Sequence, residues 1–205
     1  MRTLFIDTSM ADVSIVILDN NKVLNVINKS IPNEHSIYVV PFIDEILKKS
    51  NLKPNDIDRI MVCAGPGSFT GTRIGLTVAK VYGYALKKDV ILISSLKALA
   101  LSSDSKITIS LINARNNNYY FAIYDENYNE LECEQFITKN EILEKISKYS
   151  DYKLVSYEEE KIDDFNVIKV PFNYEKIENY YDKEKPTNIH KIKPNYLKLP
   201  SAMEK

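Results

Sequence analysis

The stretch that decides the fold is RTLFIDTSMADVSIVILD, residues 2–19. Two apolar, β-prone runs, Arg2–Asp7 and Val13–Leu18, flank a short polar segment, which is the pattern of two neighbouring strands. The segment DNNK (19–22) is rich in turn-forming residues, and Val23–Ile27 then continues the apolar pattern. The chain is therefore expected to open with a meander of three strands.

The same pattern returns in the second half of the chain. At a displacement of 106 residues and without a gap, Ile6 aligns with Ile112, Asp7 with Asn113, Ile15 with Phe121, Ile17 with Ile123 and Asp19 with Asp125. Chance similarity between two hairpins is the alternative, but the order strand, strand, strand, helix, strand also recurs. We therefore expect two related α/β subdomains of the βββαβα type, 1–103 and 104–205, joined by the linker SSDS (102–105). The second is expected to be reduced, because it contains no glycine-rich stretch.

The remaining elements follow from hydrophobic spacing and capping signals. Helices are expected over Ser36–Lys49, Phe69–Lys87, Leu96–Leu101 and Glu141–Tyr149. Further strands are expected over Arg59–Ala64, Val90–Ile93, Lys106–Asn113, Tyr119–Tyr124, Leu131–Ile137, Lys153–Ser156 and Val167–Val170. Ser36 is the expected N-cap of the first helix, and Thr138 with Glu141 forms a capping box for the last. Residues 157–164 are interpreted as a solvated turn, and the tail from Pro171 receives no assignment.

Duplicated halves with an Asp at the end of the first strand suggest the actin, sugar-kinase and Hsp70 class, also called ASKHA or RNase H-like. In that class a strand-end Asp meets a metal-bound phosphate while small hydroxyl residues approach the phosphate oxygens. Asp7, Thr8 and Ser9 fit such a first phosphate loop. The aligned residue of the second half is Asn113, so one of the two expected carboxylates is missing.

The stretch GPGSFTGTRIG (65–75) has the position of a phosphate-binding loop, between a predicted strand and a predicted helix. It fails the Walker A pattern, because Thr72 and Arg73 rather than Lys and Ser or Thr follow Gly71. It also fails the dinucleotide pattern, because its third glycine comes one residue late. An anion can still bind at the helix N-terminus. A vestigial nucleotide or anion site is therefore expected from a set of six residues: Asp7, Thr8, Ser9, Gly65, Gly67 and Ser68.

Small residues recur at every fourth position from Gly67 through Gly71, Gly75 and Ala79 to Gly83. Residues four apart lie on one face of a helix. Each interior glycine destabilises a helix by roughly 0.5–1 kcal/mol relative to alanine. Close approach of another backbone would offset this cost. Either the protein's own sheet or the helix of a partner can make that approach, and the sequence leaves both open.

Composition excludes several classes of function. The formal net charge is −1 and 44% of the residues are hydrophobic, so a real core is expected but no dedicated basic nucleic-acid surface. Asp7 and Asp12 interrupt the apolar N-terminus, which predicts a cytoplasmic protein without a signal peptide or membrane span. The two cysteines, and the histidines His35 and His190, follow no metal, redox or catalytic spacing. The Lys-rich segment IHKIKPNYLK (189–198) either touches RNA or docks on its own domain, and docking is the favoured interpretation.

Several motifs in order point to one family: IDTS (6–9) with VSIVILD (13–19), EHS (34–36), AGPGSFTGTRIGL (64–76), INAR (112–115) and PNYLK (194–198). Together they resemble the TsaB (YeaZ) family of bacterial tRNA threonylcarbamoyladenosine synthesis, which is related to the TsaD/Kae1-like proteins. The resemblance spans essentially the whole chain, and GPGSFTG is its most specific part. The family usually has Asp where this chain has Asn113, and often Arg where it has Lys198.

The resemblance implies a duplicated actin-like fold without catalytic activity. It implies a scaffold that forms a heterodimer with the metal-containing TsaD, which transfers a threonylcarbamoyl group to the adenosine beside the anticodon of tRNAs reading ANN codons. TsaE, an ATPase, would join this complex, and the chain would form a homodimer when alone. tRNA would be reached only through the complex. The chain itself would need no cofactor or metal, and ATP or ADP with Mg²⁺ would belong to the assembled complex.

The resemblance also favours a partner helix along the glycine ridge. The expected partner interface consists of twelve residues: Gly67, Phe69, Thr70, Gly71, Arg73, Ile74, Gly75, Val78, Gly83, His35, Val39 and Ile43. No catalytic residue is expected. The alternative is an actin-like small-molecule kinase or ATPase that uses Asp7, Thr8 and the turn Gly65–Thr70 to bind Mg-ATP.

Overall fold

The computed structural model describes residues 1–31, 34–162 and 165–198. The chain forms two compact units. Unit 1 contains Met1–Ser95 and Tyr174–Pro194, and unit 2 contains Leu96–Asn173 together with residues 195–198. The expected division at residue 103 is therefore replaced by an interleaved one, because part of the tail returns to the first unit. Residues 199–205 of the second expected subdomain lie outside the described residues.

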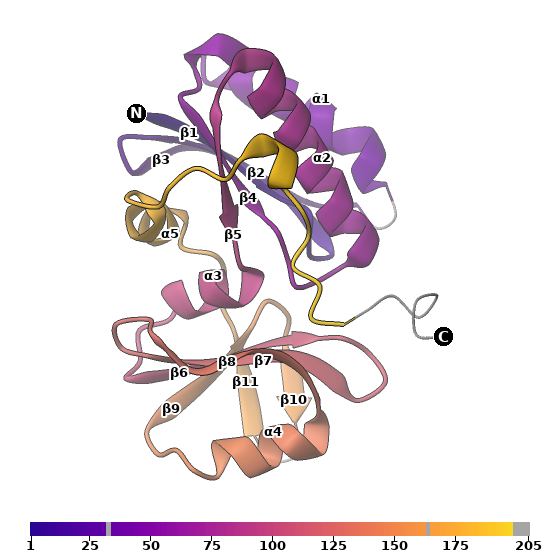
Figure 1. Ribbon diagram of the computed structural model, residues 1–205, viewed down its shortest axis with the longest axis vertical. Coiled ribbons are helices and arrows are strands. Elements are labelled where there is room, and N and C mark those ends of the chain that lie inside the picture. The colour runs from indigo at the N-terminus through magenta and orange to yellow at the C-terminus, as the bar shows by residue number, and fades with distance from the viewer. Residues whose placement is uncertain (32–33, 163–164, 199–205) are drawn as a thin grey trace. The chain divides into compact units, whose positions relative to one another are not determined.

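Unit 1 is built on a five-stranded mixed sheet in the order β3-β2-β1-β4-β5 (Figure 1). The strands are β1 (Arg2–Asp7), β2 (Asp12–Asp19), β3 (Lys22–Ser30), β4 (Arg59–Cys63) and β5 (Asp89–Ile93). β1, β2 and β3 form the antiparallel meander expected from the opening stretch. β4 pairs with β1, and β5 with β4, in parallel. The carboxyl ends of β1 and β4 therefore lie at one edge of the sheet, where the candidate phosphate loop follows.

Two helices, α1 (His35–Lys49) and α2 (Phe69–Leu86), cover one face of this sheet (Figure 1). The cap residue of α1 is Glu34, so the expected cap Ser36 was wrong and lies inside the helix. Ser68 caps α2, because its side-chain oxygen accepts a hydrogen bond from the Gly71 N–H at 3.1 Å. α2 ends at Leu86, and its C-cap Lys87 has a left-handed backbone conformation.

Unit 2 repeats the strand order of unit 1. Its main strands are β6 (Ile107–Asn113), β7 (Asn118–Asp125), β8 (Glu130–Thr138), β9 (Tyr152–Ser156) and β11 (Phe165–Lys169). They lie in the order β8-β7-β6-β9-β11, with the same parallel and antiparallel pairings as β3-β2-β1-β4-β5. The structure thus confirms the α/β class and the duplication.

The second unit is also reduced, as expected. Between β9 and β11, where unit 1 has α2, the described residues form only the short edge strand β10 (Glu160–Ile162). The turn expected over 157–164 is thus partly a strand, and its residues 163–164 lie outside the described residues. α4 (Lys139–Ile146) covers the apolar face of the sheet and has the expected capping box between Thr138 and Glu141. The expected helix Leu96–Leu101 is α3 (Ser95–Leu101).

The hairpins of the two units differ by one residue in register. Asp7 pairs with Ser14 in unit 1, whereas Asn113 pairs with Tyr119 in unit 2. An alignment without a gap would require Asn113 to pair with residue 120. Because neighbouring residues of a strand point to opposite faces, Asn113 lies on the face covered by α4, and Asp7 lies on the face opposite α1 and α2. Asn113 is therefore not the counterpart of Asp7, and that part of the alignment was wrong.

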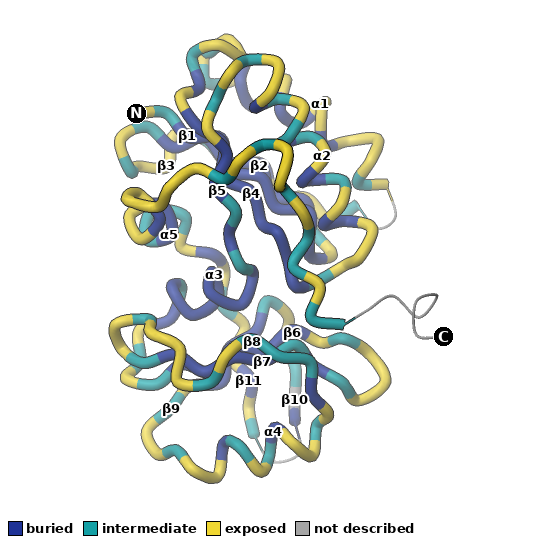
Figure 2. Tube along the Cα trace, in the orientation of Figure 1, coloured by how far each residue is buried: buried dark blue, intermediate teal, exposed yellow. Residues whose placement is uncertain are grey.

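The tail supplies two further elements to unit 1, α5 (Tyr174–Tyr181) and the 3-10 turn η2 (Ile189–Lys191). α5 packs on the face opposite α1 and α2, where the Tyr174 ring lies 5.1 Å from the Phe5 ring. Arg59 of β4 forms an ion pair at 3.2 Å with Glu178, and both side chains are buried. This pair fixes the tail to the sheet. Figure 2 shows the buried strands and the exposed outer surfaces of the helices.

Candidate functional site

The loop after β1 contains the residues expected to bind phosphate. Asp7, Thr8 and Ser9 are all buried. One carboxylate oxygen of Asp7 accepts hydrogen bonds from the Ser9 N–H at 2.8 Å and from the Ser9 hydroxyl at 2.7 Å. The Thr8 hydroxyl donates to the Gly71 carbonyl oxygen at 2.7 Å. The polar groups that would approach a phosphate are therefore used within the chain.

Burial governs the acid–base properties of this loop. Desolvation raises the pKa of Asp7, although the hydrogen bonds from Ser9 and Cys63 act in the opposite direction. Desolvation and the neighbouring Asp7 carboxylate also raise the pKa of Cys63, which favours the thiol over the thiolate. Tyr174 lies against the same region, and desolvation raises its pKa to about 12. In each case removal of the group from water disfavours its charged form.

The turn Gly65–Thr70 closes onto the same loop. Gly65 has φ 96°, a conformation that favours glycine. The Ser68 N–H donates to the Ser9 carbonyl oxygen at 2.7 Å, and the Ser68 side chain caps α2. A Cβ atom at Gly67 would overlap with the same carbonyl oxygen. The expected anion site is thus brought together in space, but its described groups contact one another.

The glycine ridge of α2 packs on the protein's own first strand. A Cβ atom at Gly71 would overlap with the Thr8 carbonyl oxygen, and one at Gly75 with the Thr8 hydroxyl. A Cβ atom at Gly83 would lie 2.6 Å from Val90 and 2.9 Å from Ile189. The expectation that a partner helix packs along this ridge is therefore corrected: the loop after β1, β5 and the tail already occupy it.

Two other expected interface residues are also internal. Val39 and Ile43 of α1 are buried in the core of unit 1, so they are unavailable to a partner. His35 is half-buried and its ring lies 3.2 Å from the Met10 carbonyl oxygen. It therefore contacts the loop between β1 and β2.

The other expected interface residues of α2 reach the surface. Phe69, Thr70 and Arg73 are exposed, and the Arg73 guanidinium lies 3.8 Å from the centre of the Phe69 ring. Ile74 and Val78 are half-buried at the edge of the core. These five residues remain a predicted partner surface.

Four apolar residues of the same two helices that are more than half exposed were missed. They are Ile37 (61% exposed) and Val40 (58%) on α1, and Val81 (61%) and Tyr84 (68%) on α2. Ile37, Val40 and Val81, together with Phe69, define what we call the α1–α2 face. A signal was present in the sequence, because α2 is apolar at residues 81 and 84 as well as along the glycine ridge. A helix that is apolar on more than one side usually has more than one buried side.

Two other features bear on chemistry. Among the described residues, no group of three or more His, Cys, Asp and Glu side chains is placed to hold a metal ion. The described part of the chain also contains no helix that is long and apolar enough to span a membrane. The residues that would correspond to a Mg-nucleotide centre do not fit one, because Asp7 is buried and engaged and Asn113 lies on the other face of its sheet.

Comparison with known proteins identifies the family. The family model of TsaD, tRNA N6-adenosine threonylcarbamoyltransferase, matches residues 26–181. The chain is 36% identical over 130 residues to the tRNA threonylcarbamoyladenosine biosynthesis protein TsaB of Buchnera aphidicola subsp. Baizongia pistaciae. That match covers 61% of this chain and 58% of the relative, so it spans less than two thirds of the relative's length. The TsaB protein of the subspecies Schizaphis graminum is 30% identical, over 72% of this chain and 70% of the relative.

A solved structure shows the same fold. YeaZ from Pseudomonas aeruginosa superposes with a TM-score of 0.77, at 19% identity, over 96% of this chain and 99% of that one. The duplicated strand order and this match establish the actin-like α/β fold. The chain therefore belongs to the TsaD-like proteins and, among them, to the TsaB (YeaZ) family.

Proposed function

We propose that the chain is a non-catalytic subunit in the formation of threonylcarbamoyladenosine beside the anticodon of tRNAs reading ANN codons. It would act by binding and activating TsaD. TsaE would join through TsaD, and the chain would self-associate when TsaD is absent. The family membership supports the pathway, and the closed loop around Asp7 supports the absence of catalysis by this chain. Any ATP, ADP or Mg²⁺ would belong to the assembled complex.

The observation that carries the proposal is the α1–α2 face. α1 and α2 lie side by side on one face of the sheet (Figure 1). The exposed apolar side chains of both helices are the kind of surface that protein partners cover. Arg73, held against Phe69, adds an aromatic and an arginine, the residue types enriched at interfaces.

The test is co-elution with TsaD after a charge is introduced into this face. Val81→Asp and Val40→Asp are expected to weaken the association with TsaD at least tenfold, which is the loss of one hot-spot contact. Leu131→Asp is the matched control, because Leu131 is also apolar and 45% exposed but belongs to unit 2. Equal co-elution of all three variants with TsaD would contradict the assignment of the interface.

The kinase or ATPase alternative makes a different prediction. It requires micromolar binding of Mg-ATP by the isolated chain, with turnover abolished by Asp7→Ala. Because the Asp7 carboxylate is buried and engaged by Ser9, we expect calorimetry to detect neither binding nor turnover.

A further inference from the structure

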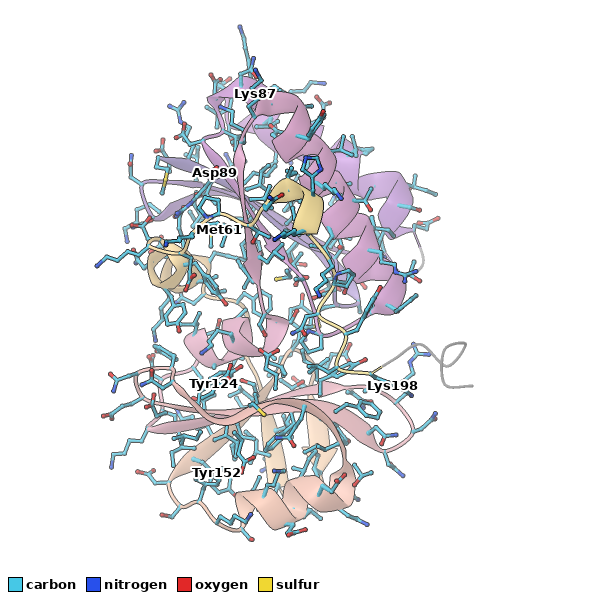
Figure 3. All side chains as sticks on the ribbon, in the orientation of Figure 1. Met61, Lys87, Asp89, Tyr124, Tyr152 and Lys198 are labelled. Carbon is cyan, nitrogen blue, oxygen red and sulfur yellow. The ribbon has the colours of Figure 1, made fainter. Side chains whose placement is uncertain are left out.

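We propose that a lysine-rich surface at the C-terminal end of α2 binds the RNA backbone, an inference that rests on the proposed role in tRNA modification. The surface consists of Lys80 and Tyr84 on α2, Lys87 at the C-cap of α2, His190 and Lys191 in η2, and Lys193 just after η2. Figure 3 shows Lys87 at the end of α2. This is the segment for which the sequence left RNA contact and docking open. The structure shows that residues 187–192 dock on unit 1, and docking leaves the charged side chains outward.

The tail is held beside α2 by specific contacts. Ile189 fills the space opposite Gly83, and the Thr187 N–H donates to the Val90 carbonyl oxygen at 2.8 Å. The His190 ring meets the Tyr84 ring edge-on at 6.2 Å between centres. His190 and Lys191 are therefore fixed next to the exposed side of α2, although they lie more than 100 residues later in the chain.

Charge is distributed unevenly over the chain. The whole sequence has 27 Lys and Arg against 28 Asp and Glu. Residues 69–93 and 187–194 contain six cationic residues but only one acidic residue, Asp89. None of Lys80, Lys87, Lys191 and Lys193 forms an ion pair with a carboxylate in the described part of the chain. These lysines also outweigh the partial negative charge at the C-terminal end of a helix.

The spacing of these side chains suits binding to a nucleic-acid backbone. Lys80 and Tyr84 are four residues apart, so they share one side of α2, and Lys87 follows the helix as its C-cap. Lys80 and Lys87 are separated by roughly 10 Å along the helix axis, an interval that spans more than one phosphate of a nucleic-acid strand. Tyr84, 68% exposed, lies between them and offers a ring on which a base can stack.

The residue types favour RNA over a protein partner. Lysine is depleted in protein–protein interfaces, where arginine and aromatic residues are enriched. Lysine is, however, a common contact of phosphate groups. The α1–α2 face, with Phe69, Arg73 and Val81, has the protein-like composition, so one helix presents two chemically different surfaces.

The test is binding of an unmodified tRNA transcript to the full chain, alone and assembled with TsaD, by fluorescence anisotropy over a range of salt concentrations. The double variant Lys87→Glu/Lys191→Glu is expected to lower the affinity at least tenfold and the salt slope by about two. Tyr84→Ala is expected to lower the affinity several-fold without changing the slope, and Tyr84→Phe to restore it. Lys106→Glu/Lys148→Glu makes the same charge change on exposed lysines of unit 2 and is expected to have no effect.

The outcomes separate this inference from the proposed function. Unchanged tRNA binding by the Lys87/Lys191 double variant, or no binding by the unmodified chain in either state, would overturn the RNA surface. If the Lys87/Lys191 double variant no longer co-elutes with TsaD but still binds tRNA, the RNA surface is also overturned, in favour of contact with an acidic protein surface. If the chain fails to assemble with TsaD, the proposed function fails, and the measurement on the chain alone still tests the RNA surface. Lys87→Gln/Lys191→Gln provides a milder double variant if the charge reversal prevents folding.

Discussion

The two units differ in the connection between the last two strands of their shared order, which are β4 and β5 in unit 1 and β9 and β11 in unit 2. In unit 1 the connection between β4 and β5 contains the 18-residue helix α2, and in unit 2 the described residues between β9 and β11 form only the three-residue strand β10. The strand order is nevertheless the same. The pairing of strands therefore maintains the fold, whereas the crossover can lose its helix.

The difference between these two connections also indicates where the proposed binding surfaces lie. α2 presents part of the α1–α2 face and of the lysine-rich surface, and the described residues of unit 2 form no equivalent helix. The first crossover is held by close backbone packing on Thr8. The second is held in part by Glu160, which accepts hydrogen bonds from the Asn113 side chain and, at 3.1 Å, from the Tyr119 hydroxyl. The two connections should therefore respond very differently to substitution.

The largest effect is expected for Gly71→Leu. The new side chain would overlap with the Thr8 carbonyl oxygen, which belongs to the backbone and cannot rotate away. Overpacking of this kind lowers the free energy of unfolding by about 3 kcal/mol or prevents folding. Gly75→Leu should act in the same way through the Thr8 hydroxyl, so loss of TsaD binding by either variant would reflect unfolding.

Urea unfolding measures this effect, and Thr77→Leu is the control. Thr77 is exposed on the same helix, so its substitution should change the free energy of unfolding by no more than about 0.5 kcal/mol. A Gly71→Leu variant as stable as Thr77→Leu would mean that α2 is not packed closely on β1.

A smaller effect is expected in the second crossover. Tyr119→Phe removes one hydrogen bond to Glu160 and should lower the free energy of unfolding by about 1 kcal/mol. Tyr152→Phe, in the same unit, is the control, because among the described residues the Tyr152 hydroxyl has no hydrogen-bond partner. If both variants are equally stable, Glu160 does not hold the second crossover.

The smallest effect is a change in pH dependence. Burial raises the pKa of Asp7 in the folded state, so folding favours its protonated form. The contribution of protonated Asp7 to the free energy of unfolding is fully present below the pKa of an unfolded Asp, about 3.9. It is lost as pH rises through the pKa of Asp7 in the folded state. Asp7→Asn cannot titrate, so its free energy of unfolding relative to the original chain should rise with pH. Thermal unfolding between pH 4 and pH 8 measures this trend, and parallel curves would show that Asp7 has an ordinary pKa.

Much of the fold is readable from local sequence patterns. The strands of both meanders, α2 and the capping box of α4 follow from apolar spacing and from residues within four positions of one another. α5 carries the same kind of signal, since Tyr174, Ile177 and Tyr181 have helical spacing, but the polar residues around them obscured it. β10 consists of only Glu160, Lys161 and Ile162, which is too short and too polar to be recognised as a strand.

What the sequence could not provide was the identity of long-range partners. The spacing of Gly71 and Gly75 correctly indicates that something approaches α2 closely, but the approaching group is Thr8, more than 60 residues earlier. Glu178 looks like a surface residue until Arg59 is placed beside it. The one-residue shift in register at Asn113 depends on backbone pairing and leaves no trace in the residue types.

The interleaved order of the units has a consequence for synthesis on the ribosome. Unit 1 needs Tyr174–Pro194, so it cannot be completed when residue 95 leaves the exit tunnel. Until α5 emerges, Arg59 lacks Glu178 and Phe5 lacks Tyr174. Most of unit 2 is translated in the meantime and can fold first. A nascent chain of this protein therefore cannot complete its first-made half until most of its second half has been made.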